Sequence, residues 1–346
     1  MDGSEASLAV LQYRHVRNRE LKFLVIVEDA AKNDLRVHST FNSVGESRLH
    51  SIYDQLGTVT GRFSSKDPNA QNFPRPDKNK KANSVRALFA APPGKKLVIA
   101  DFAQMELVIA ASVVGEKNML AALHAGEDLH KKTAAHIQGV DPATIGDKDP
   151  ARNLGKSCNF GLLYGQSACG GHADYPNGGL RGFARNVYGV ELTVYEAMHA
   201  RDEWFKLYPG FINYHRNGWN LAEAFSDHGF GYVRTHVVGR VQYFLTTDKE
   251  IRPLLKHKVF SSLVNTPIQG TSAEIFKLVM IQVNEDLPEA EIVNVVHDEI
   301  VLLCDDDKAD YVISEVGRIM VDSTHIIFPG APMKADVKSA NNWAQK

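Results

Sequence analysis

Two β-rich apolar segments, about two hundred residues apart, each lead into an aspartate. The run at 97–100 ends at Asp101, and the run at 293–296 ends at His297 and Asp298. A carboxylate on a stiff strand is costly to desolvate unless a cation or a hydrogen-bond network meets it. Each aspartate alone is an ordinary residue for a strand end or turn. If the fold brings both together, they predict a cradle for a hard divalent cation.

The composition is that of a soluble globular protein. Of 346 residues, 44% are hydrophobic and 23% are charged, and no apolar run approaches the length of about 20 residues that spans a bilayer. The first five residues lack the basic start and apolar core of a secretory signal, and their acids argue against an organelle transit peptide. Three cysteines form no metal-ligand spacing and no disulfide framework. We expect a soluble intracellular protein without a membrane partner, cytoplasmic or, for a viral protein, in the host cytoplasm.

The order of periodic segments predicts an α+β fold. We expect three parts, namely residues 1–124, a mostly helical insertion at 125–228, and residues 229–346, with the two outer parts completing one sheet that carries the acids. Helical periodicity and strand-like runs mark the elements. The expected helices are 7–25, 128–138, 150–164, 192–206, 211–226 and 254–287, with helical pattern also from the end of the 95–100 strand to about Ala122. The expected strands are 95–100, a hairpin at 230–245, two runs within 292–303 and a last strand from 333. Residues 170–182 are rich in glycine and predict a loop.

The predicted helix at 150–164 carries two bases and two aromatic residues at intervals of four. Arg152, Lys156, Phe160 and Tyr164 advance only about 40° per step, so all four share one face. The bases are suited to polyphosphate oxygens and the aromatic rings to a nucleobase. An ordinary amphipathic helix, with core aromatics and solvated bases, has the same pattern. Gly161 inside this helix costs stability and indicates that something approaches the backbone closely there.

These segments together resemble the family A DNA polymerases, the bacterial DNA polymerase I family. The segment from Asp101 to Leu107, the Arg-x3-Lys-x3-Phe-x3-Tyr-Gly pattern at 152–165 and the segment 296–299 resemble three family motifs, in the family's order. Further similarity lies at 60–65, 128–130 and 265–271. The resemblance implies a palm with an antiparallel sheet and a helical fingers subdomain inserted into it.

The resemblance also implies a role for each matching residue in the addition of deoxynucleotides to a primer. Asp101 and Asp298 would hold two Mg²⁺ ions, with the Phe102 carbonyl and Glu299 close by, and Mn²⁺ is a candidate substitute. The incoming nucleotide would be met by His130, Arg152, Lys156, Phe160, Tyr164, Gln104 and Glu106. Within this set Lys156 would protonate pyrophosphate, and Glu106 would exclude a 2′-hydroxyl. Primer-template DNA would be met by Arg62, Arg86, Asn265, Gln269 and His297.

The family's thumb and exonuclease domains would precede residue 10. We therefore hypothesise that a separate protein chain supplies thumb, exonuclease or processivity function, or that the enzyme works with a loading partner. Two alternatives stay open at this stage, a single-subunit RNA polymerase and a catalytically weak nucleic-acid-binding subunit of a split polymerase. The net charge of −2 is low for a nucleic-acid binder and fits a need for a partner. Glu106 and Gln269 favour DNA synthesis, and retention of Asp101, Asp298 and Lys156 together favours an enzyme.

Overall fold

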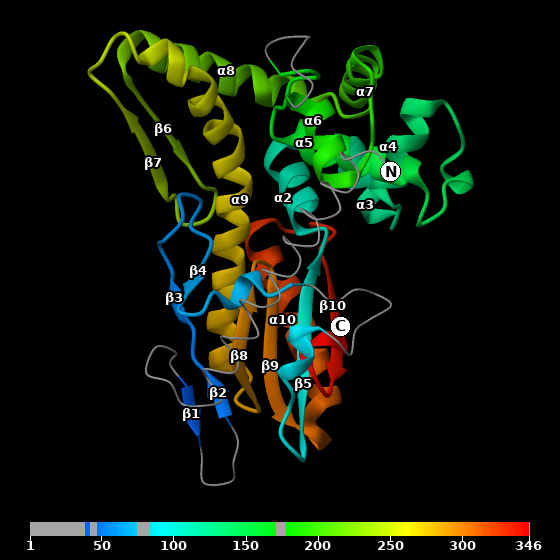
Figure 1. Cartoon of the computed structure of the whole chain (residues 1–346), viewed down its shortest axis with the longest axis vertical. Coiled ribbons are helices and arrows are strands. Elements are labelled where there is room, and N and C mark those ends of the chain that lie inside the picture. The colour runs from blue at the N-terminus through cyan, green and yellow to red at the C-terminus, as the bar shows by residue number, and fades with distance from the viewer. Residues whose placement is uncertain (1–38, 42–46, 75–83, 171–177, 346) are drawn as a thin grey trace, which may run out of the picture. The chain divides into compact units, whose positions relative to one another are not determined.

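The computed structural model describes residues 39–41, 47–74, 84–170 and 178–345 (Figure 1). The chain divides into two compact units, the first made of residues 1–103, 276–323 and 334–346, and the second of residues 104–275 and 324–333. The helix expected at 7–25 lies outside the described residues. The three-part division expected from the sequence stays a prediction. In the described part of the chain, no helix has both the length and the apolar character needed to cross a membrane.

The first unit is built on a four-stranded antiparallel sheet. Its strands lie in the order β10 (Lys334–Ala340), β5 (Lys95–Ala103), β9 (Glu299–Asp305) and β8 (Ala290–Val296) (Figure 1). The strands predicted at 95–100, within 292–303 and after 333 are therefore confirmed. Segments from three distant parts of the sequence meet in this one sheet.

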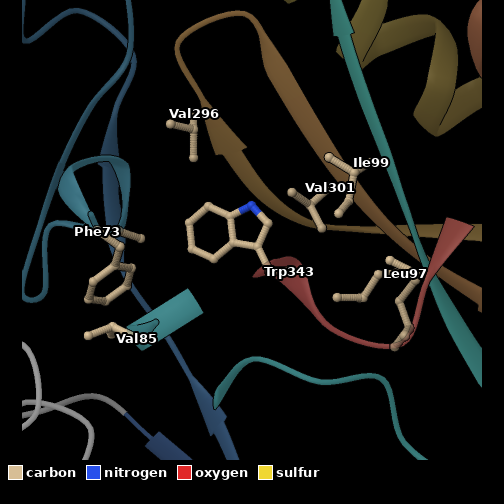
Figure 2. Close-up of a cluster of buried hydrophobic side chains, with 10 residues drawn as sticks. Phe73, Val85, Leu97, Ile99, Val296, Val301 and Trp343 are labelled. Carbon is tan, nitrogen blue, oxygen red and sulfur yellow. The ribbon is translucent and has the colours of Figure 1, made fainter. Parts of the chain in front are cut away.

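Both faces of the sheet are buried, which explains why its central strands are continuously apolar. On one face α10 (Ala309–Ile327) packs against β10, where a Cβ at Gly317 would be in ordinary van der Waals contact with Val337 at 3.5 Å. On the other face Leu97, Ile99 and Val301 pack against Trp343, with Phe73 and Val85 beyond it (Figure 2). The sheet is therefore the middle layer of the first unit.

Short elements complete the first unit. The strands β1 (Ser39–Phe41) and β2 (Ser47–Leu49) pair with each other, as do β3 (Ile52–Asp54) and β4 (Ser64–Lys66). Among the described residues of this unit, 3₁₀ turns lie at Ala70–Asn72, Val85–Leu88, Asp306–Lys308 and Trp343–Gln345. The last of these places Trp343 in the core, 2% exposed.

The second unit is mostly helical. Its helices are α2 (Met105–Val114), α3 (Lys117–His124), α4 (Leu129–Gln138), α5 (Pro150–Leu163), α6 (Gly179–Tyr188), α7 (Val194–Leu207) and α8 (Gly210–His228), with a 3₁₀ turn at Pro142–Thr144. Local chemistry sets their ends: Thr193 and Glu196 form a reciprocal capping box at α7. The helices predicted at 128–138, 150–164, 192–206 and 211–226 are confirmed to within about two residues.

A hairpin and a long helix follow. The strands β6 (Phe230–Arg234) and β7 (Val241–Leu245) pair antiparallel, and α9 (Arg252–Asp286) runs through Pro267. Val233 and Phe244 of the hairpin pack against a core shared by α8 and α9. Figure 1 shows the hairpin running beside α9. The loop expected to reach residue 182 was wrong at its end, because α6 already begins at Gly179. The glycines mislead there, since Gly179 has φ +61° and lies against backbone at 167–170, where a Cβ does not fit.

Candidate active site

The pairing of β5 with β9 brings the two predicted acids to the same end of one sheet. Asp101 lies directly opposite Glu299, and the backbone N–H of Phe102 donates to the carbonyl of Asp298 at 3.4 Å. The described residues contain no group of three or more His, Cys, Asp or Glu arranged to hold a metal ion. The carboxylates of Asp101 and Asp298 and the carbonyl of Phe102 are hard oxygen donors carried on the adjoining ends of β5 and of the turn before β9. Such a set fits Mg²⁺, which usually keeps waters and takes substrate oxygens as further ligands.

The acid-bearing strands are bordered by residues in left-handed backbone conformations. His297, in the two-residue turn between Val296 and Glu299, has φ 60°, and Gln104, three residues after Asp101, has φ 57°. A non-glycine residue in this region carries strain, and such strain concentrates at functional sites. Both side chains are exposed. Gln104 also occupies the position before the first turn of α2.

A third acid borders the same row. Asp336 of β10 lies directly opposite Asp101 on the side away from Glu299. Side chains opposite one another in an antiparallel pair share a face, so three carboxylates cross three neighbouring strands. Sequence reasoning missed Asp336 because the neighbour of a strand cannot be read from the strand itself. The alternation within residues 334–340 would have placed it once the pairing was known.

Glu299 and Arg86 lie in a buried network that the sequence did not predict. The indole N–H of Trp343 donates to Glu299 Oε1 at 2.7 Å, and Arg86 Nη1 lies 3.7 Å from the same oxygen. Arg86 also donates from Nε and Nη2 to the carbonyl of Phe73, and its guanidinium lies 4.2 Å from the Trp343 ring centroid. Both charged side chains are nearly inaccessible, at 4% and 5% exposure. The expected DNA contact of Arg86 and metal contact of Glu299 stay predictions.

In the second unit, α5 presents the base-and-aromatic face. Asp149 caps the helix by accepting the N–H of Ala151, and Pro150 begins it. The four predicted residues, Arg152, Lys156, Phe160 and Tyr164, are all half-buried, whereas the other residues from Gly155 to Leu163 are buried. They therefore share one face, as predicted, with Tyr164 at the C-cap position.

Asp128 orients Arg152. Its Oδ2 accepts a hydrogen bond from Arg152 Nε at 2.8 Å, while its Oδ1 caps α4 by accepting the N–H groups of His130 and Lys131. Partial burial raises the pKa of Asp128, but the Arg152 hydrogen bond, the Lys131 N–H and nearby positive charge outweigh it, so the pKa lies below its ordinary value. Sequence reasoning used Asp128 only as part of a motif and missed this role.

His130 is buried beside the face of α5 that carries Phe160. Its ring centroid lies 5.5 Å from that of Phe160, and its Nδ1 lies 3.1 Å from Asn159 Nδ2. Burial chiefly, together with the charges of Arg152 and Lys156, lowers the pKa of His130 to about 4, against an opposing effect of Asp128. The ring is therefore neutral at pH 7.

Two glycines allow close packing around α5. A Cβ at Gly155 would lie 1.9 Å from the carbonyl oxygen of His130, so only glycine permits this approach of α4. A Cβ at Gly161 would lie 2.7 Å from Gln166 Oε1 and 3.2 Å from Phe183. The close approach predicted at Gly161 is confirmed, and the approaching groups belong to the protein itself.

The remaining predicted residues are distributed over both units. Glu106 lies half-buried in the first turn of α2; burial chiefly, and then the Glu106 charge, raise the pKa of Tyr188. Asn265 and Gln269 are half-buried one turn apart on α9, and the buried Oδ1 of Asn265 has no hydrogen-bond partner in the described part of the chain. Arg62 follows Gly61 in the turn between β3 and β4.

An antiparallel sheet with acids at one end, in a chain that also carries a helix with a base-and-aromatic face, is the pattern of a polymerase domain. The fold agrees: a solved structure described as the POL domain of Pol1 from M. smegmatis, in complex with DNA primer-template and dNTP, matches with a TM-score of 0.71 and 24% identity over 94% of this chain and 51% of that one. A family model for DNA polymerase family A matches residues 2–345, and the chain belongs to that family.

Curated relatives agree with this assignment. DNA polymerase I of Aquifex aeolicus is 32% identical over 94% of this chain and 50% of its own length. DNA polymerase I of Pseudomonas aeruginosa is 32% identical over 86% of this chain and 30% of its own length. A thermostable DNA polymerase I of Thermus thermophilus is 30% identical over 86% of this chain and 32% of its own length. The chain thus spans half or less of the length of these relatives. The family is metal-dependent, which fits the oxygen donors described above.

Proposed function

We propose that this chain is a DNA-templated DNA polymerase that adds deoxynucleotides to a primer 3′ end and releases pyrophosphate, in DNA replication or repair. The observation that carries the proposal is the β5–β9 pairing, which sets Asp101 and Asp298 at one end of the sheet in a chain of family A. Primer-template DNA and deoxynucleoside triphosphates are the partners. The separate chain expected to supply a thumb stays a prediction.

Asp101 and Asp298 would hold two Mg²⁺ ions, with the Phe102 carbonyl as a further donor and Glu299 near them. Bound Mg²⁺ supplies activation of the primer 3′ oxygen and neutralisation of charge on the triphosphate, and Mn²⁺ is the candidate substitute. The rigid strand β5 fixes the direction of Asp101, and the strained turn at His297 fixes that of Asp298.

The second unit would hold the nucleotide. Arg152 and Lys156 would bind triphosphate oxygens through charge-assisted hydrogen bonds. The 3′ oxygen would give up its proton to solvent and form a bond to the α-phosphorus as the bond from that phosphorus to the bridging oxygen breaks. Lys156 would give the leaving pyrophosphate a proton. Phe160 would stack at the nucleotide, and Tyr164 would lie at the template position.

Other residues would select the sugar and hold the DNA. Glu106, in the first turn of α2, would exclude a 2′-hydroxyl, with Gln104 beside it at the nucleotide. Arg62, Asn265, Gln269 and His297 would contact primer-template. Minor-groove acceptors are common to all correct base pairs, so contacts by Arg62, Asn265 and Gln269 would test pair shape without reading sequence.

The test is primer extension with the Asp298→Asn variant. Incorporation should fall at least about a thousandfold, since two-metal chemistry loses a ligand, while affinity for primer-template stays within about threefold. The matched control is Asp305→Asn, the same replacement at the exposed far end of β9. Unchanged incorporation by Asp298→Asn would refute the assignment. DNA binding by the wild type without any incorporation would favour the nucleic-acid-binding subunit instead.

Nucleotide choice separates the DNA polymerase from the RNA polymerase alternative. Wild-type protein should use deoxynucleotides in preference to ribonucleotides on a DNA template. The Glu106→Ala variant should narrow that preference by about tenfold or more, because the side chain that excludes the 2′-hydroxyl is lost. Preferred use of ribonucleotides by the wild type would overturn the proposal.

A further inference from the structure

A closed hydrogen-bond network lies between α4, α5 and α7, with Asn159 at its centre. Trp204 Nε1 donates to Asn159 Oδ1 at 3.0 Å, and Thr133 Oγ1 donates to the same oxygen at 2.9 Å. Trp204, Thr133 and Asn159 are fully buried. An indole N–H can only donate, so the amide atom facing Trp204 must be the oxygen.

The other end of the amide is fixed by the same logic. Asn159 Nδ2 donates to the carbonyl of Leu129 at 3.2 Å, and a carbonyl can only accept. The same Nδ2 lies 3.1 Å from Nδ1 of His130. An amide N–H facing a ring nitrogen requires that nitrogen to accept, so the proton of the neutral imidazole is on Nε2.

We propose that Asn159 is a positioning residue of the nucleotide site, which holds His130 as the neutral Nε2–H tautomer so that the ring offers an uncharged donor to a phosphate oxygen of the incoming nucleoside triphosphate. The proposal rests on the proposed function for the nucleotide. It assigns to Asn159 a part in catalysis that acts only through His130.

The charges around His130 support a neutral imidazole beside two positively charged side chains. Arg152 and Lys156 on α5 already supply positive charge, and both oppose protonation of His130; Asp128 favours it but is engaged by Arg152. A protonated ring would also set an N–H at Nδ1 against the N–H of Asn159. The network therefore keeps His130 as a neutral Nε2–H donor, which can orient a phosphate oxygen without adding a third positive charge.

The direct test is the ¹⁵N NMR spectrum of histidine side chains in the full chain, because the two neutral tautomers and the imidazolium give different ring nitrogen shifts. The His130 signals are assigned by their loss in His130→Gln. We expect the Nε2–H tautomer from pH 5 to pH 8. An Nδ1–H tautomer or an imidazolium at pH 7 would overturn the proposal.

The kinetic test compares Asn159→Asp with Asn153→Asp, the same replacement on a half-buried residue of the same helix. A carboxylate at 159 can still accept from Trp204 and Thr133 but cannot donate to His130, so the ring should move its proton to Nδ1. The KM for deoxynucleotide should rise about tenfold or more, with unchanged affinity for primer-template, and Asn153→Asp should match the wild type. A folded Asn159→Asp with unchanged KM would show a structural role only and overturn the proposal.

Trp204→Phe provides a second route if Asn159→Asp does not fold. Loss of the indole N–H removes one of the two groups that fix the amide and leaves only the Leu129 carbonyl, so a weaker preference for the Nε2–H tautomer and a raised KM are expected. A single Nε2–H tautomer with unchanged KM would count against the proposal. A wild-type chain that incorporates no nucleotide would refute the proposed function. The tautomer spectrum would still decide whether Asn159 orients His130.

Discussion

The indole nitrogen of Trp343 lies 2.7 Å from Oε1 of Glu299, so the 3₁₀ turn at Trp343–Gln345 is bonded to the first residue of β9. Glu299 follows Asp298, the predicted metal ligand, and Arg86 approaches the same oxygen. The hairpin that carries Asp298 is therefore anchored through Glu299, by the hydrogen bond from Trp343 and by the buried guanidinium of Arg86.

Trp343→Phe should lower the free energy of unfolding by about 2 kcal/mol, because a buried carboxylate loses one of its donors. Arg86→Gln should cost roughly 3 kcal/mol or more, because Glu299 would keep a buried charge without its cation. Urea denaturation measures both. Lys95→Gln, which breaks an exposed ion pair at the far end of the same strand pair, should change stability little. Equal effects of Arg86→Gln and Lys95→Gln would contradict the buried network.

Gly155→Ala should destabilise the protein by about 1–3 kcal/mol, although alanine is the better helix former. The added Cβ would collide with the backbone carbonyl of His130, and backbone cannot rotate away. Because α4 must move, the KM for deoxynucleotide should rise as well. Gly146→Ala is the control, since a Cβ there meets open space. Thermal unfolding of both variants checks the prediction, which fails if Gly155→Ala is as stable as wild type.

The free energy of unfolding should fall as the pH is lowered from about 6.5 toward 4. Burial holds the pKa of folded His130 at about 4, so within this window the unfolded chain takes up a proton that the folded chain does not. The contribution of this residue is about 3 kcal/mol across the window. Burial also lowers the pKa of His215, so the comparison needs a variant.

His130→Gln should flatten the dependence of stability on pH between 6.5 and 4, measured by urea denaturation at several pH values. The same replacement at exposed His124 should leave the slope nearly unchanged. Equal slopes for wild type and His130→Gln would show that the imidazole titrates in the folded protein as it does in the unfolded chain.

His297→Gly should be more stable than His297→Ala by about 1 kcal/mol, because only alanine keeps the strain of φ 60°. Both variants lose the imidazole, so both should incorporate nucleotide more slowly if that ring contacts primer-template. Paired unfolding and extension assays separate the two effects. An alanine variant as stable as the glycine variant would show that the turn relaxes.

The sequence predicted the elements well because their signals are local. The strand before Asp101, the face shared by Arg152 and Phe160, and the hairpin at Asp298 all follow from periodicity within a few residues. The position of Asp336 opposite Asp101 does not, because strand pairing joins segments more than two hundred residues apart.

The contacts of buried polar groups could not be predicted from the sequence either. Nothing near Arg86 in the sequence indicates that it stacks on Trp343, and a mid-helix asparagine such as Asn159 has no pattern that marks it. Gly179 shows the opposite failure, since a glycine-rich segment predicted a loop where the packing of α6 requires a residue without a side chain.

The first unit is assembled from segments that lie far apart in the sequence, and this affects how the chain folds during synthesis. Its sheet takes β5 from early in the chain, β8 and β9 from late in it, and β10 with Trp343 from the last described residues, whereas residues 104–275 of the second unit are contiguous. Contiguous segments can fold as they leave the ribosome, but distant ones must wait for their partners. During synthesis the helices within residues 104–275 can therefore fold before β8, β9 and β10 are made, whereas the sheet edge that carries Asp101 forms only after those strands have emerged.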